Sequence, residues 1–352
     1  MRLGVCAMVV FSSLQVCEAF PGAISWTEDF STDPIASGRW KVPAGQDYSR
    51  FSYDGANHLL TVHYDTFLPT AFCEHAVDPV SGRGICRTRD FEYEVTFRIR
   101  SAGFFADPDG FAQIGWGMIN SVTTGGNRAG YDPPGPPYSF DVMTFDYFPN
   151  VSVQFGGPTL AATAIHSDIG QGYYGAFEFP FGAESDLNQD LGDETIALDT
   201  EYTATVAFSA ANQMLVARVR HGENYLNIDA DGSGGPGGPD GDATTIQTFF
   251  YADDPLAMDR FALTAWQDSG SPAGASVVAD VDILAVSFSA PASDKGDVNG
   301  DGAIDGRDVS AFVHTVLSGV PDPQAVMRAD MNFDGSATLA DLPRFVEALL
   351  CP

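Results

Sequence analysis

The chain has 352 residues, 44% of them hydrophobic and 12% aromatic. It is therefore long enough for about two domains of roughly 150 residues each, and too apolar to be disordered throughout. Aspartate and glutamate number 47 against 17 lysine plus arginine, which gives a formal charge of 17 − 47 = −30. Because such a charge repels nucleic-acid phosphates and anionic lipid, we expect no nucleic-acid partner and no membrane-surface partner.

The amino terminus has the layout of a secretory signal peptide. Arg2 is followed by a mostly apolar run, residues 3–16, and then by Cys17-Glu18-Ala19, where the small residues of a cleavage site are expected. We therefore expect residues 1–19 to be removed and the protein to be secreted, to the extracellular space or the cell surface. A lipoprotein cleavage at Cys17 is the alternative. No later stretch reaches the ~20 apolar residues of a membrane span, so no span is expected.

Three cysteines remain once residues 1–19 are removed, namely Cys73, Cys86 and Cys351. Cys73 and Cys86 flank a turn-rich stretch, and an oxidising compartment favours a local disulfide between them. Cys351 would then be an odd thiol near the end of the chain. The alternative is that all three are free thiols.

Residues 24–290 have the pattern of an all-β domain. In residues 91–100, apolar side chains at every second position alternate with polar ones such as Glu92 and Glu94, as in a strand with one buried face. The fold class expected from these strands, with no helical crossovers between them, is mostly β, an antiparallel jelly-roll β-sandwich. Further strands are expected at residues 59–64, 111–119, 140–148, 203–208, 214–221, 261–266 and 277–287.

A polar linker, residues 291–296, leads into a second domain, residues 297–352, built on a repeat with an offset of 330 − 297 = 33 residues. Each repeat places Asp, Asn, Asp and Gly at positions 1, 3, 5 and 6 of a calcium loop, and an apolar helical stripe follows at the same offset. Oxygens at alternate positions of a tight loop converge on a hard cation, so we expect two Ca²⁺ ions here. The expected ligands, with backbone carbonyls at position 7, are Asp297, Asn299, Asp301, Ala303, Asp305, Asp308, Asp330, Asn332, Asp334, Ser336, Thr338 and Asp341.

Two such loop–helix units, without the leading helix of ordinary EF-hands, closely resemble a type I dockerin over residues 294–350. The resemblance implies a small α-helical domain with calcium-dependent folding and docking onto a cohesin-type receptor, usually in assemblies that act on polysaccharide. Positions 10 and 11 of the loops tend to carry partner specificity in dockerins. They are Gly306-Arg307 and Leu339-Ala340 in this chain, so the two units differ from each other.

Two acidic motifs of the sandwich, one at Asp109 and one ending at Asn150, are similar in order and spacing to those of L-type lectins, which belong to the concanavalin A-like lectin/glucanase superfamily. The resemblance implies a concanavalin A-like sandwich that binds a polysaccharide or another glycan. It places the carbohydrate site at Asp109, Gly126 and Asn150, and a further calcium site at Asp146, the carbonyl of Phe148 and Asn150.

Three functions stay open for the sandwich. Glucanases of this superfamily usually place paired carboxylates as ExDxE on one strand, and the sequence has no such motif. Glu92 and Glu94 lie opposite an apolar face and are read as solvent charges. A non-catalytic glycan-binding protein is therefore preferred. The alternative is an enzyme, either a hydrolase acting on O-glycosyl bonds or a polysaccharide lyase, with unassigned catalytic residues; an adhesive scaffold is the third.

The aromatic residues do not separate these functions. Trp40 and Trp116 are read either as platforms on which sugar rings stack or as part of the core, and exposure would distinguish the two interpretations.

Overall fold

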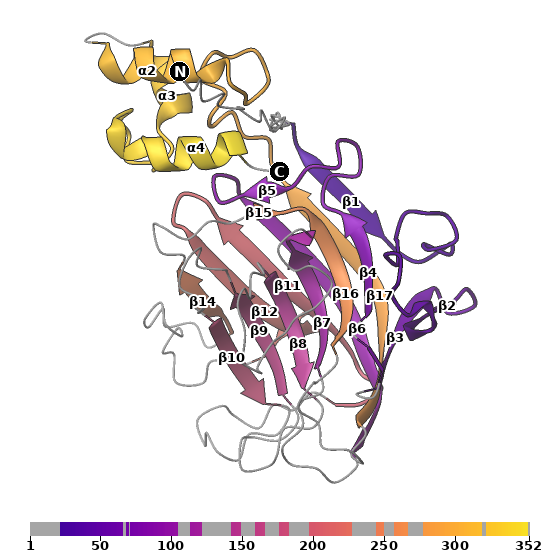
Figure 1. Ribbon diagram of the computed structural model, residues 1–352. Helices are drawn as coiled ribbons and strands as arrows, with labels where there is room; N and C mark the ends of the chain where they lie inside the picture. Colours follow the sequence, from indigo (N-terminus) through magenta and orange to yellow (C-terminus); the bar gives the residue numbers. More distant parts are fainter. Residues whose placement is uncertain are drawn as a thin grey trace, which may run out of the picture.

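The computed structural model describes residues 22–65, 68–69, 71–104, 113–121, 142–148, 159–165, 176–182, 197–226, 244–249, 257–266, 277–318 and 322–350. In these ranges, antiparallel strands build sheets that lie face to face, and short helices follow at one end (Figure 1). The mostly β fold with a small helical unit, expected from the sequence, is confirmed.

The larger sheet has nine strands among the described residues. Its path runs β13-β12-β11-β6-β17-β3-β2, with β1 beside β17 and β14 beside β12, and neighbouring strands are antiparallel. The strands are β1 (Ile24–Glu28), β2 (Phe51–Asp54), β3 (Leu59–Asp65), β6 (Phe91–Phe104), β11 (Glu201–Ser209), β12 (Met214–His221), β13 (Asn224–Tyr225), β14 (Ile246–Phe249) and β17 (Val277–Ala290).

The smaller sheet has six described strands in the order β10-β9-β8-β7-β16-β4, also antiparallel. They are β4 (Ala71–Ala76), β7 (Gln113–Ile119), β8 (Val142–Phe148), β9 (Thr159–Ile165), β10 (Ala176–Gly182) and β16 (Arg260–Trp266). Two further short strands, β5 (Ile85–Cys86) and β15 (Ala257–Met258), pair with each other near the helical unit (Figure 1). A single 3₁₀ turn, η1 (Tyr48–Arg50), precedes β2.

Aromatic side chains from the facing surfaces of the two sheets form the core of the sandwich. The rings of Phe97 and Trp116 have centroids 4.6 Å apart, and Tyr93 donates a hydrogen bond of 2.9 Å to the carbonyl of Met143 on the opposite sheet. Gly117 makes this approach possible. Its φ is +150°, and a Cβ there would lie 2.2 Å from the Met143 oxygen.

The helical unit comprises α2 (Asp308–Leu317), α3 (Pro323–Ala329), η4 (Leu339–Asp341) and α4 (Leu342–Leu350). It has its own hydrophobic cluster, separate from that of the sandwich. Phe312 and Phe345 stack at its centre with centroids 4.1 Å apart and planes 6° apart. These residues occupy equivalent places in the repeat (345 − 312 = 33), so the sequence repeat is also a structural repeat.

The structure agrees with the expected strands and adds others. Each of the eight expected strands coincides with an observed one, although β6 continues to Phe104 and β17 to Ala290. The elements that were not expected are helix α3 and strands β1, β2, β4, β5, β9, β10, β13, β14 and β15. Trp40 and Trp116 are completely buried, so they belong to the core and are not sugar platforms.

The expected disulfide between Cys73 and Cys86 is wrong. Cys73 is a free, buried thiol on β4, and burial raises the pKa of this thiol far above its ordinary value. Cys86 is disulfide-bonded, but to a cysteine outside the described ranges. The two residues are close in sequence but lie on different sheets, since β4 pairs with β16 and β5 with β15.

Candidate calcium-binding and docking site

The first acidic loop is organised around the carboxylates at its two ends. The Asp297 carboxylate accepts the N–H groups of Asp301 and Gly302 at 3.0 Å each. The Asp308 carboxylate, at the start of α2, accepts the N–H of Asn299 at 3.0 Å. The hydrogen bonds hold positions 1, 3, 5 and 12 of the loop around one centre.

The second loop repeats these hydrogen bonds residue by residue. Asp330 accepts the N–H groups of Asp334 and Gly335 at 3.0 and 3.1 Å, and Asp341 accepts that of Asn332 at 3.0 Å. The equivalence extends to the side chains at position 3, because Asn299 and Asn332 each accept the N–H of position 5 at 2.8 and 3.0 Å. Both loops therefore have the same backbone framework.

Glycine is required at position 6 of each loop. Gly302 and Gly335 have φ values of +88° and +87°, a conformation that costs most other residues free energy. This sharp turn lets the backbone of Ala303 and Ser336 follow at position 7. The N–H of Ala303 donates to Asp301, as that of Ser336 does to Asp334.

The charges of the first loop favour a bound cation. Burial, followed by the charges of Asp297 and Asp301, raises the pKa of Asp308, while hydrogen bonds from Asn299 and Asp305 oppose the shift. Close carboxylates that repel one another are stabilised by a divalent ion between them.

The oxygen donors fit calcium, which takes 6–8 oxygen ligands from carboxylates, amides and backbone carbonyls. Within the described ranges, no three His, Cys, Asp or Glu side chains form a metal centre by themselves. Besides its carboxylates, each loop offers the amide oxygen of Asn299 or Asn332 and the backbone carbonyl at position 7 as oxygen donors. The expected site residues lie together in this way, and their role as ligands remains a prediction.

Arg307, at position 11 of the first loop, contacts two expected ligands, which the sequence reasoning did not anticipate. Its Nε donates to Asp305 Oδ2 at 2.8 Å, and its Nη1 lies 3.1 Å from Asp301 Oδ2. This ion pair lowers the pKa of Asp305. Ala340 occupies the equivalent position of the second loop, where the cation near an expected ligand is instead Lys295, with its Nζ 3.6 Å from Asp330 Oδ2. Only the residue type at position 11 signalled this difference.

The helices behind the loops expose part of their apolar stripes. Phe312 and Phe345 are buried, and Val316 and Leu349 pack against the same cluster. The remaining stripe residues are exposed, with 76% of Leu317 and 68% of Leu350 accessible. We call them stripe A (Val309, Val313 and Leu317 on α2) and stripe B (Leu342, Val346 and Leu350 on α4).

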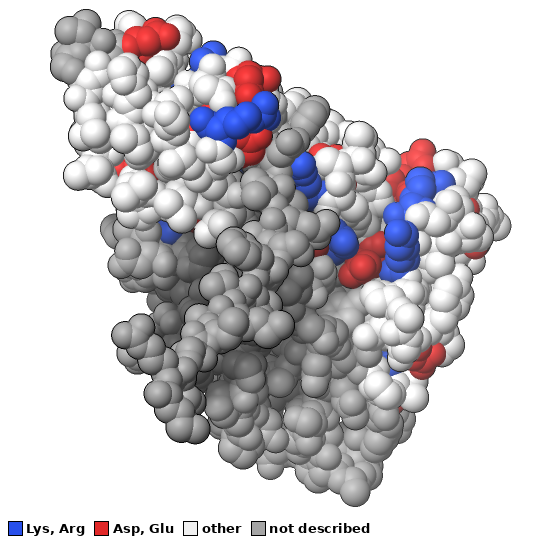
Figure 2. Space-filling model, turned by 45° about the horizontal axis from the view of Figure 1, so that its top comes forward, with Lys and Arg blue, Asp and Glu red and all other residues white. Residues whose placement is uncertain are grey.

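Figure 2 shows the surroundings of the helical unit on one face of the molecule. Acidic and basic side chains lie next to one another, and a wide area beside them is uncharged. Exposed apolar surface that is bordered by charge is typical of protein–protein docking sites.

All three residues of the expected carbohydrate site of the sandwich lie outside the described residues, namely Asp109, Gly126 and Asn150. Asp146 and Phe148 lie on β8, where the backbone of Asp146 is in register with Gly115 of β7. The segments with Asp109 and Asn150 adjoin the same end of β7 and β8, at Gln113 and Phe148. The segment with Gly126 adjoins the other end, at Ile119 and Val142.

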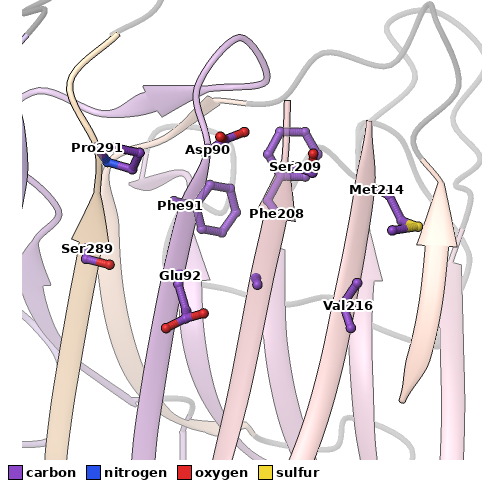
Figure 3. Close-up of a pocket in the computed structure, with 10 residues that line it drawn as sticks. Asp90, Phe91, Glu92, Phe208, Ser209, Met214, Val216, Ser289 and Pro291 are labelled. Atoms are coloured by element: carbon purple, nitrogen blue, oxygen red, sulfur yellow. The ribbon is translucent and has the colours of Figure 1, made fainter. Parts of the chain in front are cut away.

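A hollow of about 320 Å³ lies on the outer face of the larger sheet. Figure 3 shows Glu92 of β6, Val216 of β12 and Ser289 of β17 around it. Burial and then the charge of Glu94 raise the pKa of Glu92. Glu92 and Glu94 both lie on this outer face, opposite the core, as their alternation with apolar residues indicated.

Paired oxygen-rich loops, each followed by a helix with an exposed stripe, define a dockerin-type module. Residues 295–350 match the family model of the dockerin type I domain. This confirms the resemblance inferred from the sequence. Dockerin domains bind calcium, and dockerin proteins are typically extracellular. No curated protein matches the chain.

Several solved lectin structures align with most of the chain at low scores. Peanut lectin with a 9mer peptide has a TM-score of 0.41 and 11% identity, over 76% of this chain and 97% of that chain. The acidic winged bean lectin complexed with methyl-α-D-galactose has a TM-score of 0.41 and 9% identity, over 76% of this chain and 98% of that chain. The VIP36 exoplasmic/lumenal domain in its Ca²⁺/Man3GlcNAc-bound form has a TM-score of 0.38 and 9% identity, over 77% of this chain and 89% of that chain.

Among the described residues, none of the helices is long and apolar enough to cross a membrane.

Proposed function

We propose that the chain is a secreted carbohydrate-binding protein whose dockerin domain attaches it, in the presence of calcium, to a cohesin-type receptor. The observation that carries the proposal is the pair of stripes A and B, which are exposed at equivalent positions directly behind two equivalent acidic loops. An apolar stripe that is not covered within the chain is a docking surface for another protein. Assemblies of this kind usually act on polysaccharide.

Each loop would bind one calcium ion through its own six of the twelve ligands named above. Calorimetry on the full chain tests this directly. We expect Asp297→Ala and Asp330→Ala each to bind about one ion fewer than the wild type, because each substitution removes the position-1 carboxylate of one loop. Glu223→Ala, an exposed acidic residue of the sandwich, is the control and should leave both ions. Full binding by both loop variants would contradict the assignment.

Receptor docking is tested with a panel of immobilised type I cohesin domains. The full chain should be retained in calcium and released by EDTA, because helix positions depend on the loops. Retention by none of the panel in calcium would count against a cohesin-type partner.

Carbohydrate binding would use Asp109, Gly126 and Asn150, with a further calcium ion at Asp146, Phe148 and Asn150. The segment with Asp109 precedes β7 and the segment with Asn150 follows β8, at the same end of these two neighbouring strands, which supports this proposal. A panel of polysaccharides should retain the full chain, and Asn150→Ala should abolish retention.

Asp330→Ala is the matched control for this experiment, because it removes an ion of the dockerin domain and should leave glycan retention unchanged. Release of reducing ends or unsaturated products would replace the binding function with that of a hydrolase or lyase. Absence of both retention and product would leave the sandwich as an adhesive scaffold.

A further inference from the structure

Cys86 is disulfide-bonded, and few cysteines of the sequence are left as its partner. Among the described residues, the other cysteine is Cys73, which is free. The full sequence has five cysteines, and two of them, Cys6 and Cys17, fall in the stretch expected to be removed on export. Within the mature chain, Cys351 is then the one partner left.

A residue adjacent to Cys86 lies close to a residue of the helix that precedes Cys351. Arg87 follows Cys86, and its Nε lies 3.8 Å from Oε2 of Glu347 on α4. Glu347 is four residues before Cys351, or about one helical turn, and α4 ends at Leu350, next to Cys351. The Arg87 side chain is only 1% exposed, so this contact belongs to a packed interface between the dockerin domain and the sandwich (Figure 1).

Two further observations place the same surfaces together. Burial, followed by the positive charge of Arg87, lowers the pKa of Arg344 on α4. Phe333, in the second calcium-type loop, packs against the hydrophobic cluster of the sandwich, and the Nζ of Lys295 lies 4.5 Å from its ring centroid. The interface thus includes both α4 and the loop that precedes it.

The linker is held at both of its ends. Arg89, in the turn between β5 and β6, donates hydrogen bonds to the carbonyls of Ala290 and Pro291 at 3.1 and 3.0 Å. Lys295 donates one of 2.6 Å to the carbonyl of Asp330. A linker with such contacts does not behave as a free tether.

We propose that Cys86 and Cys351 form a disulfide that closes the dockerin domain onto the sandwich and fixes the direction in which the docking helices face. The two thiols lose two protons and two electrons, which reduce the disulfide of a thiol-oxidising protein of the export pathway to a dithiol. The proposal depends on neither calcium nor glycan binding, so its outcome is separate from that of the proposed function.

The closed arrangement leaves both stripes accessible. At 100° per residue, Arg344 and Glu347 project roughly 150° away from Leu342 and Val346 on α4. The helix therefore contacts the sandwich with one side and presents stripe B on the other. A receptor bound to either stripe would hold the sandwich in a defined orientation.

Peptide mapping of the secreted full chain without reduction tests the pairing. We expect one cross-linked peptide that contains Cys86 and Cys351, and one free thiol, Cys73, after denaturation. Three free thiols, or a link between Cys86 and a second chain, would overturn the proposal.

Small-angle X-ray scattering tests the mechanical consequence. Cys86→Ser and Cys351→Ser should increase the maximum dimension of the particle by the same amount, because each removes the same bond. The double variant should show no further increase. Cross-linked peptide without any change in dimension would show that the non-covalent contacts hold the domain alone, and would overturn the role of the disulfide in fixing it.

Discussion

Arg307 gives the two calcium-type loops different electrostatics although their backbones are equivalent. Its guanidinium holds the carboxylates of Asp305 and Asp301, which are expected ligands at positions 9 and 5. We predict that Arg307→Ala tightens calcium binding at the first loop about fivefold, since an exposed ion pair contributes about 1 kcal/mol at most. Calorimetry on the full chain, with the two ions fitted separately, measures this.

The second loop provides the matched control. Ala340→Arg places the same side chain at position 11 of that loop and should weaken its calcium binding by a similar factor. If Arg307→Ala leaves both binding constants unchanged, the guanidinium does not compete with the cation.

Phe345 and Val346 are neighbours in sequence with opposite roles in the structure. Phe345 is buried against Phe312, whereas Val346 is exposed on stripe B. We predict that Phe345→Ala lowers the free energy of unfolding of the dockerin domain by about 3–5 kcal/mol, and that Val346→Ala changes it by less than about 0.5 kcal/mol. Urea unfolding in calcium, followed by circular dichroism, measures both. Equal losses would show that Val346 is also part of the core.

Individual site residues were predictable where local spacing determines geometry. The loop positions from Asp297 to Asp308 follow from the chemistry of one tight turn, and the structure brings them together. The pairing of Cys86 was not predictable, because separation in sequence does not give the distance between strands. The position of Arg307 was visible in the sequence, but its bond to Asp305 depends on the fold.

Some secondary-structure elements could be predicted from the sequence and others could not. Strand β6 was predictable because its alternation is complete, with one face in the core and Glu92 and Glu94 on the other. Strand β4 was missed because nearly all of its side chains are buried, which removes the alternation. Helix α3 has seven residues, too few to show a helical period. The stripes of α2 and α4 were predicted as apolar, but the sequence did not indicate that half of each is exposed.

Stripe B offers a longer apolar surface than stripe A. Leu339, exposed at position 10 of the second loop, extends it, whereas the equivalent residue of the first loop is Gly306. We therefore predict that Val346→Asp weakens binding to a type I cohesin domain at least tenfold, and that Val313→Asp weakens it less. Surface plasmon resonance with the full chain in calcium compares them. Equal losses would indicate two interchangeable docking modes, and a larger loss for Val313→Asp would reverse the assignment.

The whole molecule is acidic, with a formal charge of −30, and its described residues form two separate hydrophobic clusters, one in each domain. Most of the folding free energy of each domain comes from its own cluster, because apolar burial dominates stability. Calcium bound by the two loops, by contrast, would act on the dockerin domain alone. The sandwich shares with that domain a contact through Phe333 and the Arg87–Glu347 pair.

We therefore predict two unfolding transitions in calorimetry of the full chain, and we expect EDTA to lower the dockerin transition by removing the two loop ions. A ligand at 100 times its dissociation constant stabilises the folded state by about 2.7 kcal/mol per site, so two ions should shift the dockerin transition by many degrees while the sandwich transition stays nearly constant. The double variant Asp297→Ala/Asp330→Ala should reproduce the effect of EDTA in the presence of calcium. If both transitions fall together in EDTA but only one falls in the double variant, a calcium ion in the sandwich is the cause, and Asn150→Ala should remove that additional shift.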